Sequence, residues 1–203
     1  MNITMKTKII SILALLLTVT QGAWAISGSG TAGSPYLLET YSDWTTFVDN
    51  VNAGTYATTA CAKLMCDISG TTYRINKDYS GTFDGNGHSI SRGSGAAGTP
   101  IFPTVNGATI KNHHVEGSFT FDATNKGALI GTATGTTTVE NCRVSSAITY
   151  SLSSVESGCI VGNNQGTMTI RGCVFDGSLN IQNNNGEMAG IVFSSQSGGG
   201  VSV

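Results

Sequence analysis

Asp84 and His88 stand four residues apart in the stretch Asp-Gly-Asn-Gly-His, and a carboxyl group near an imidazole suits acid–base chemistry. Hydrolysis of a glycosidic bond needs two carboxyl groups held roughly 5 to 9.5 Å apart. The sequence contains no Asp-Asp pair, and its aspartates are scattered singly. Asp-Gly-Asn-Gly is in itself a strong turn signal. We therefore interpret Asp84 to Gly87 as a tight bend and His88 as a strand residue, and keep Asp84 and His88 only as a weak catalytic alternative.

The histidines and cysteines do not form a metal-binding pattern. His113 and His114 are adjacent, so in a strand they point to opposite faces and cannot share one ion. The chain has five cysteines, an odd number, and their spacing matches no zinc motif. We expect no metal, no cofactor and no closed disulfide framework, with the cysteines acting as small apolar core residues.

Composition narrows the class of protein. The chain has 203 residues, of which 11% are charged, and its net charge is -2. This balance excludes the basic face that a nucleic-acid partner requires. Gly is abundant at 27 residues and Pro is scarce at 3, which indicates frequent turns made by Gly and Asn.

Residues 1–25 have the organisation of a signal peptide. Lys6 and Lys8 precede an apolar run from Ile9 to Leu17, and Ala23-Trp24-Ala25 provides a small-x-small cleavage site. The run is shorter than the roughly 20 apolar residues that a spanning helix needs. We expect an exported chain that begins near Ile26 and has no membrane span after cleavage.

A repeat dominates the second half of the sequence. Three segments align, namely Thr109 to Phe121, Thr138 to Tyr150 and Thr169 to Ile181. A second shared block begins at Gly127, Gly158 and Ala189, so that 31 residues separate each of these from the next. A fixed period near 30 residues is typical of a solenoid, in which one coil stacks on the next.

Within each repeat the side chains alternate as in a strand and then break at Asn112, Asn141 and Gly172. Asn and Gly are the residues that most readily accept positive φ, so this column predicts a tight structural turn in every coil. Between the turns, the positions predicted to face inward are almost all apolar, whereas Lys111, Glu140 and Arg171 are predicted to face water. The pattern indicates an all-β fold, a right-handed parallel β-helix.

The same column alignment places Cys142 above Cys173 in successive coils, with backbones about 4.8 Å apart. A disulfide tolerates that separation, but stacked side chains point in parallel and often miss the required dihedral angle. We expect a reduced, packed ladder.

Upstream of the repeats, the apolar residues from Trp44 to Val51 have helical spacing, with Ser42 as the expected N-cap and Gly54 as the stop. We predict a helix over 42–53 that caps the first coil. The domain organisation that follows is a signal peptide over 1–25, an N-terminal cap over 26–80 containing a strand, this helix and the first coil, and solenoid coils over 81–203.

No such cap is expected at the other end. Val201 stands 31 residues after Ile170, on the column of the next coil, and the sequence stops two residues later. An uncapped edge favours pairing with other chains. We expect a chain truncated at its C-terminal end, or one that depends on a neighbour through end-to-end self-association.

The stretch "YSGTFDGNGHSIS" at Tyr79 to Ser91, with "GALIG" and "GCIVG" and the strand segments that follow them, resembles the GLUG-type repeat region of large secreted bacterial surface proteins. The resemblance implies an adhesin-like module, and some relatives join this region to a peptidase domain. His113 and Phe193 depart from the family pattern, which has an aliphatic residue and Gly there. "GHSISRGS" at Gly87 to Ser94 is also similar to a short motif of polygalacturonase-type glycosidases.

The longer bend of each coil is predicted to project on one side of the stack, where solenoids often bind their partners. We expect a non-catalytic module, secreted or on the outer cell surface with the periplasm as the alternative, that binds a glycan or an extracellular protein. A fragment of a polysaccharide-active glycosidase or lyase, or of a larger surface peptidase, remains the alternative. Because amides and aromatic rings suit sugar hydroxyls, the expected contact residues are Tyr150, Asn163, Asn164, Gln165, Asn183, Asn184 and Asn185.

Overall fold

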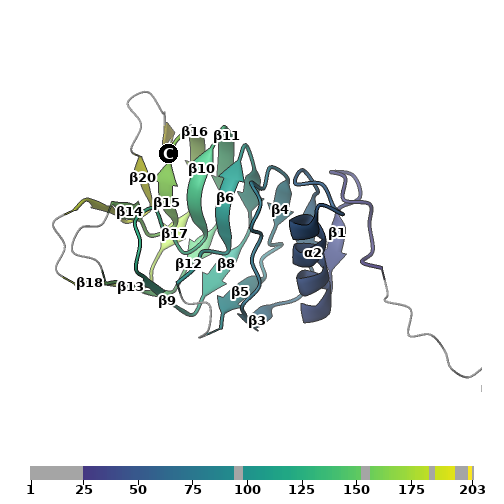
Figure 1. The fold of residues 1–203 in the computed structure, drawn as a ribbon, viewed down its shortest axis with the longest axis horizontal. Helices are drawn as coiled ribbons and strands as arrows, with labels where there is room; N and C mark the ends of the chain where they lie inside the picture. Colours follow the sequence, from purple (N-terminus) through teal and green to yellow (C-terminus); the bar gives the residue numbers. More distant parts are fainter. Residues whose placement is uncertain (1–24, 94–97, 152–155, 183–185, 195–200, 203) are drawn as a thin grey trace, which may run out of the picture.

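The computed structural model describes residues 25–93, 98–151, 156–182, 186–194 and 201–202. These residues form a stack of parallel β-coils with one helix, α2, at the N-terminal end (Figure 1). The predicted parallel β-helix is therefore confirmed. Successive coils rise along the long axis of the molecule, from the helix at one end to the strands of the last repeat at the other.

The largest sheet runs the whole length of the stack and contains a strand from each coil. Its strands pair in parallel throughout. In spatial order they are β1 (Tyr36–Leu38), β2 (Ala62–Leu64), β4 (Thr82–Asp84), β7 (Thr109–Lys111), β11 (Thr136–Glu140), β16 (Thr167–Arg171) and β21 (Val201–Ser202).

Two further sheets complete the main wall of the coils. The four-stranded sheet contains β6 (Phe102–Asn106), β10 (Ile130–Thr134), β15 (Val161–Asn164) and β20 (Val192–Ser194). The five-stranded sheet contains β3 (Ile68–Thr71), β5 (Ser89–Arg92), β8 (His114–Glu116), β12 (Arg143–Val144) and β17 (Val174–Phe175).

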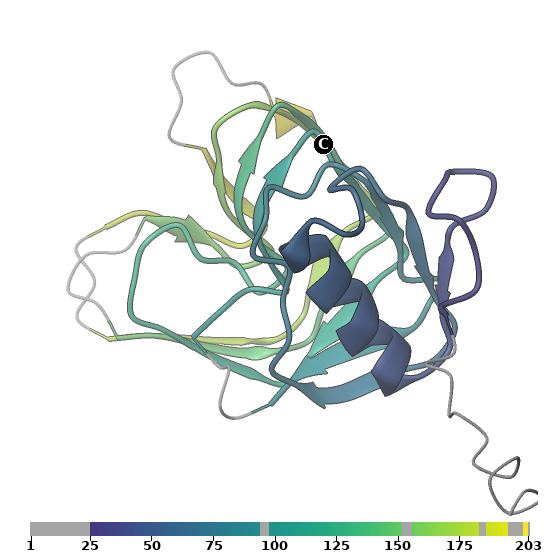
Figure 2. The ribbon, with the colours of Figure 1, turned by 45° about the vertical axis from the view of Figure 1, so that its right-hand side comes forward.

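The longer bend of each late coil is itself built from strands and forms a lobe beside the main stack (Figure 2). Its walls are a three-stranded and a two-stranded sheet, containing β9 (Ser118–Phe121), β13 (Ala147–Tyr150), β18 (Ser178–Ile181), β14 (Ser157–Gly158) and β19 (Met188–Ala189). The predicted common side of the long bends is thus correct, and the strands that flank these bends extend the apolar core as the walls of the lobe.

The predicted repeat register is confirmed strand by strand. Val139 pairs with Ile110 on one side and with Ile170 on the other, and all three side chains are buried. The register departs from prediction at the last strand, where Val201 pairs with Met168. The expected alignment of Val201 with Ile170 is therefore wrong by two residues, a shift that keeps the same face inward because side chains alternate with a period of two.

The tight turns lie where the Asn and Gly column predicts them. Asn112, Asn141 and Gly172 have φ of 51°, 52° and 60°. The Asn141 Nδ2 group donates to the Asn112 Oδ1 atom at 3.3 Å, so the turn side chains also bridge adjacent coils. Asn fits here because it tolerates left-handed backbone and its amide can pair along the stack.

The helix α2 extends over Tyr41–Ala53 and covers the N-terminal end of the stack. Its N-cap is Thr40, whose hydroxyl accepts from the Asp43 backbone N–H while the Asp43 carboxylate accepts from the Thr40 N–H. The predicted N-cap at Ser42 is wrong by two residues because this capping box starts the helix earlier. Gly54 ends the helix as predicted, with φ of 80°.

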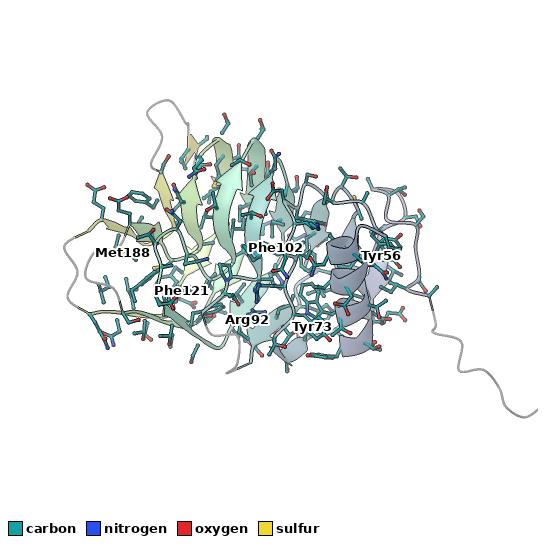
Figure 3. All side chains as sticks on the ribbon, in the orientation of Figure 1. Tyr56, Tyr73, Arg92, Phe102, Phe121 and Met188 are labelled. Atoms are coloured by element: carbon teal, nitrogen blue, oxygen red, sulfur yellow. The ribbon has the colours of Figure 1, made fainter. Side chains whose placement is uncertain are left out.

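One continuous core joins the cap, the coils and the lobe. Trp44 of α2 meets Phe83 edge-on with ring centroids 6.0 Å apart, and Phe83 in turn meets Phe102 at 5.2 Å. Figure 3 places Phe102 inside the main stack and Phe121 in the lobe. Phe121 lies 5.3 Å from Tyr150, so each part of the core has stacked aromatic rings in successive layers.

The glycines of the second repeated block mark a close approach of two coils. A Cβ atom on Gly162 would lie 2.4 Å from the Lys126 nitrogen and 2.6 Å from the Gly127 nitrogen. A Cβ atom on Gly127 would likewise lie 2.6 Å from the Gly162 nitrogen. The Gly-x-x-x-Gly spacing of this block therefore follows from backbone contact between neighbouring coils.

The last coil is the least covered part of the described structure. Leu179 is 39% exposed, although its counterpart Ile148 occupies the same column one coil earlier. Ile148 is 1% exposed because β18 covers it. Within the described residues, β17 and β18 are the edge strands of their sheets at this end of the stack.

Candidate functional site

Three of the predicted contact residues are buried, which corrects the expected binding surface. Tyr150 is 0% exposed, and its hydroxyl donates to the Lys126 carbonyl and, at 3.4 Å, to the Gly158 carbonyl across the lobe. Asn163 and Asn164 are 2% and 0% exposed. Tyr150 lies inside the lobe on β13, whereas Asn163 and Asn164 belong to β15 of the four-stranded sheet, between β10 and β20.

The remaining predicted contacts are placed differently. Gln165 is exposed, directly after β15. The Asn164 amide donates to the Gly166 carbonyl at 2.9 Å and its Oδ1 accepts from the Gly166 N–H at 3.1 Å, so Asn164 shapes this turn. Asn183, Asn184 and Asn185 lie outside the described residues.

Asp84 ends β4 and is held by three donors. Its Oδ1 atom accepts from the Asn86 N–H at 2.9 Å and from the Asn112 amide at 3.0 Å, and Lys111 Nζ lies 3.6 Å from Oδ2. Burial acts to raise the pKa of Asp84, but these hydrogen bonds and the lysine outweigh it and lower the pKa below its usual value. Asp84 is therefore an ionised carboxylate at neutral pH.

His88 is not joined to Asp84. It precedes β5, and its Nδ1 atom lies 3.4 Å from Asp67 Oδ1. Within the described residues, no ion pair or hydrogen bond links the His88 ring to Asp84. The two side chains of the weak catalytic alternative thus have different partners.

His113 points into the core and His114 does not, as expected for adjacent strand residues, and only one nitrogen of the His113 ring is paired. Its Nδ1–H donates to the His88 carbonyl at 3.2 Å, whereas Nε2 is buried with no hydrogen-bond partner. The ring meets Phe83 edge-on at 5.4 Å. Burial lowers the pKa of His113 to about 3, so the ring is neutral in the folded protein.

This burial predicts acid lability from His113. The unfolded chain takes up a proton near pH 6.5 and the folded protein only near pH 3. The contribution of His113 to the free energy of unfolding is therefore fully present above pH 6.5. It is lost by about 1.4 kcal/mol for each pH unit as the pH falls from 6.5 toward 3. We expect His113→Leu to make the urea unfolding midpoint depend less steeply on pH between pH 7 and pH 4.5 than it does in the wild type. An equal slope in His113→Leu and wild type would contradict the assignment.

All five cysteines are free, as predicted. Cys142 is buried and Cys173 is half-buried below it in the next coil. The hydrogen bond between the two thiols raises the pKa of Cys142 and lowers that of Cys173 to about 7.

The outer face of the seven-stranded sheet carries a regular polar array. Thr82, Thr109, Thr138 and Thr169 pair in register on successive strands, and all four side chains point outward and are half-buried. We call these residues the threonine column. Adjacent strands lie about 4.8 Å apart, so the four hydroxyls repeat at that interval along the axis of the stack.

A second column lies two residues further along each strand. Its members alternate in sign, and they are Lys63, Asp84, Lys111, Glu140 and Arg171. We call these residues the charged column. Lys111 pairs with Asp84 at 3.6 Å, and Arg171 pairs with Glu140 at 3.3 Å. Such surface pairs add little stability, about 0 to 1 kcal/mol each, so the column is better explained by what it presents to solvent.

A groove of about 280 Å³ lies over the N-terminal half of these two columns. Ala32 and Pro35 form an apolar wall, Ala62 of β2 and the preceding Cys61 lie beneath it, and the polar lining consists of Lys63, Thr82, Asp84, Thr109 and Lys111. The wall is fixed in place, because the Cys61 N–H donates to the Gly30 carbonyl at 2.7 Å and the Ser29 N–H donates to the Ser34 carbonyl at 2.9 Å.

The strand alternation alone does not predict this groove. Lys111 is predicted to face water, but no role follows from the sequence for Lys63, Thr82 or Thr109. A signal was present, since Thr109, Thr138 and Thr169 are each followed two residues later by a charged residue of alternating sign. The wall formed by residues 28–35 has no counterpart in the repeats and could not be placed from the periodicity.

Comparison with known proteins adds no functional assignment. No family model, no curated protein and no solved structure matches this chain. Among the described residues, no helix has the length and apolar character needed to cross a bilayer.

Proposed function

We propose that this chain is an adhesin-like, non-catalytic module of the bacterial surface or secretome that binds an extended glycan on the outer face of the seven-stranded sheet. The observation that carries the proposal is the pair of in-register columns, threonine and charged, that end in the groove. The proposed export of the chain is supported by the signal-peptide pattern of residues 1–25.

The geometry suits a polymer with a regular repeat. Each coil adds one hydroxyl and one charged group at the same place on a flat face, so a sugar chain laid along the stack meets equivalent partners coil after coil. Threonine hydroxyls both donate and accept, as sugar hydroxyls do. Many weak contacts repeated along a polymer give affinity without a deep pocket.

The state of Asp84 supports a binding role over hydrolysis. A glycosidase acid must hold a proton near neutral pH, which requires a raised pKa. The pKa of Asp84 is lowered, since three donors stabilise its charge and outweigh its burial. Asp84 is also the single carboxylate among the residues that line the groove, whereas the reaction needs two.

Glycan binding can be tested with the mature chain, residues 26–203, on an array of plant, microbial and mucosal glycans, with matrix proteins as separate arms. We expect micromolar to millimolar binding to an extended glycan. Replacing Thr82, Thr109 and Thr138 together by valine should weaken it at least tenfold, because each substitution removes a hydroxyl and keeps a β-branched side chain. Thr132→Val, outward on the four-stranded sheet, is the matched control.

Circular dichroism should show that both the triple variant and Thr132→Val are folded. Glycan binding that survives the triple substitution, or binding to matrix proteins alone, would refute the proposed site.

A further inference from the structure

We infer that the groove selects an acidic glycan, holding a sugar carboxylate or sulfate at Lys63. This inference rests on the proposed function and names the ligand class for the same surface. A neutral glycan would need only the threonine column, so the placement of charge in the groove decides between the two classes.

Lys63 is the one basic residue of the charged column that has no ion-pair partner among the described residues. It pairs in register with Asp84 on the next strand, but the Asp84 carboxylate is occupied by Lys111 and by the Asn86 and Asn112 donors. Among the described residues, Lys63 takes part in no ion pair. On its other side Lys63 pairs with Leu37 of β1, which carries no charge.

The residues that line the groove carry a net positive charge. Two lysines and one aspartate face it, and the aspartate is already neutralised from within the protein. Lys63 is half-buried beside the wall of Ala32 and Pro35, where a partly desolvated ion interacts more strongly with an opposite charge than it would in open water. An ammonium group accepts carboxylate and sulfate alike, since it acts as a compact point charge.

The rest of the lining fits a sugar ring bearing that charge. Pro35 and Ala32 offer an apolar surface to the C–H face of the ring, and the Thr82 and Thr109 hydroxyls lie on the sheet to meet its hydroxyl groups. Ligand sites typically combine an apolar wall with a few placed polar groups in this way. At about 280 Å³ the groove suits a short segment of a longer chain.

Calorimetry with defined oligosaccharides tests the selection. The probes are oligogalacturonate, its methyl ester, and a sulfated but uncarboxylated carrageenan oligomer. We expect the ester to bind about tenfold more weakly than the acid, the effect of losing one charge-assisted hydrogen bond. Lys63→Gln should weaken binding of the acid equally and abolish its advantage over the ester. The carrageenan arm identifies whether sulfate serves as well as carboxylate.

Cys61 provides a second readout inside the groove. It is half-buried and lines the same cavity, whereas Cys66 is half-buried outside it. We expect saturating oligogalacturonate to slow iodoacetamide labelling of Cys61 severalfold and to leave Cys66 unchanged, as measured by peptide mass spectrometry.

Lys77→Gln is the matched control, because Lys77 is an exposed lysine that lies outside both columns and is not among the groove residues. If Lys77→Gln weakens binding as much as Lys63→Gln, the attraction is diffuse and the inference fails. If acid and ester bind equally and both are lost in the threonine variant, the proposed function stands and the acidic selection is refuted. Absence of binding to every glycan refutes the proposed function itself.

Discussion

Replacing Gly162 by alanine is expected to lower the free energy of unfolding by about 3 kcal/mol, the upper part of the range for overpacking. The added Cβ would lie 2.4 Å from the Lys126 nitrogen, 2.5 Å from the Asn125 carbonyl carbon and 2.6 Å from the Gly127 nitrogen. All three atoms belong to the backbone of the preceding coil, so no side-chain rotation relieves the clash. The two coils would have to separate, and Ile160 and Val161 beside them would lose packing.

Urea unfolding followed by circular dichroism measures this effect. Gly190→Ala is the control, since a Cβ there meets no atom within 4 Å and the substitution should change stability by no more than about 0.5 kcal/mol. Should Gly162→Ala unfold at the same urea concentration as Gly190→Ala, the close approach of the coils would be wrong, and with it our explanation of the repeated Gly-x-x-x-Gly block.

Trp44→Ala is expected to be more damaging still, with a loss of about 4 kcal/mol. The indole is completely buried under α2, meets Phe83 edge-on at 6.0 Å, and donates from Nε1 to the Thr71 hydroxyl at 3.0 Å. Its removal would leave a cavity between the cap and the first coils and would remove one of the two donors to the Thr71 hydroxyl, the other being the Tyr73 N–H. Because α2 covers the end of the stack, the N-terminal coils should become the first to open.

Native-state hydrogen exchange locates that opening. In Trp44→Ala, protection should fall most in β2 and β3, and least in β11 and β16, which lie several coils away. Tyr41→Ala, on the same helix but 44% exposed, should behave like the wild type. Uniform loss of protection along the stack would mean that α2 does not act as a local cap.

Much of the fold could be predicted because its rules are local. The left-handed turns at Asn112, Asn141 and Gly172 follow from the intrinsic preference of these residue types for positive φ. The pairing of Val139 with Ile110 and Ile170 follows from the period, since identical coils stack in identical register. The end of the helix at Gly54 is likewise a short-range signal. The start of the helix depends on the capping box between Thr40 and Asp43, and from the sequence alone Ser42 fits the N-cap position as well as Thr40 does.

The candidate site could not be predicted in the same way. Tyr150, Asn163 and Asn164 have the composition of a binding loop, yet Tyr150 is enclosed in the lobe and the two asparagines are buried in β15 of the stack. Conversely, Lys63 and Thr82 look like ordinary strand residues until residues 28–35 are placed beside them as the wall of a groove.

The amino-acid sequence by itself therefore determined the period, the turns and the inward face of each strand, because these depend on backbone preferences and on alternation within one coil. Only the tertiary structure decided which outward faces remain accessible. Exposure depends on segments remote in the chain: the lobe covers Tyr150, and the N-terminal wall turns part of an open sheet into the groove around Lys63.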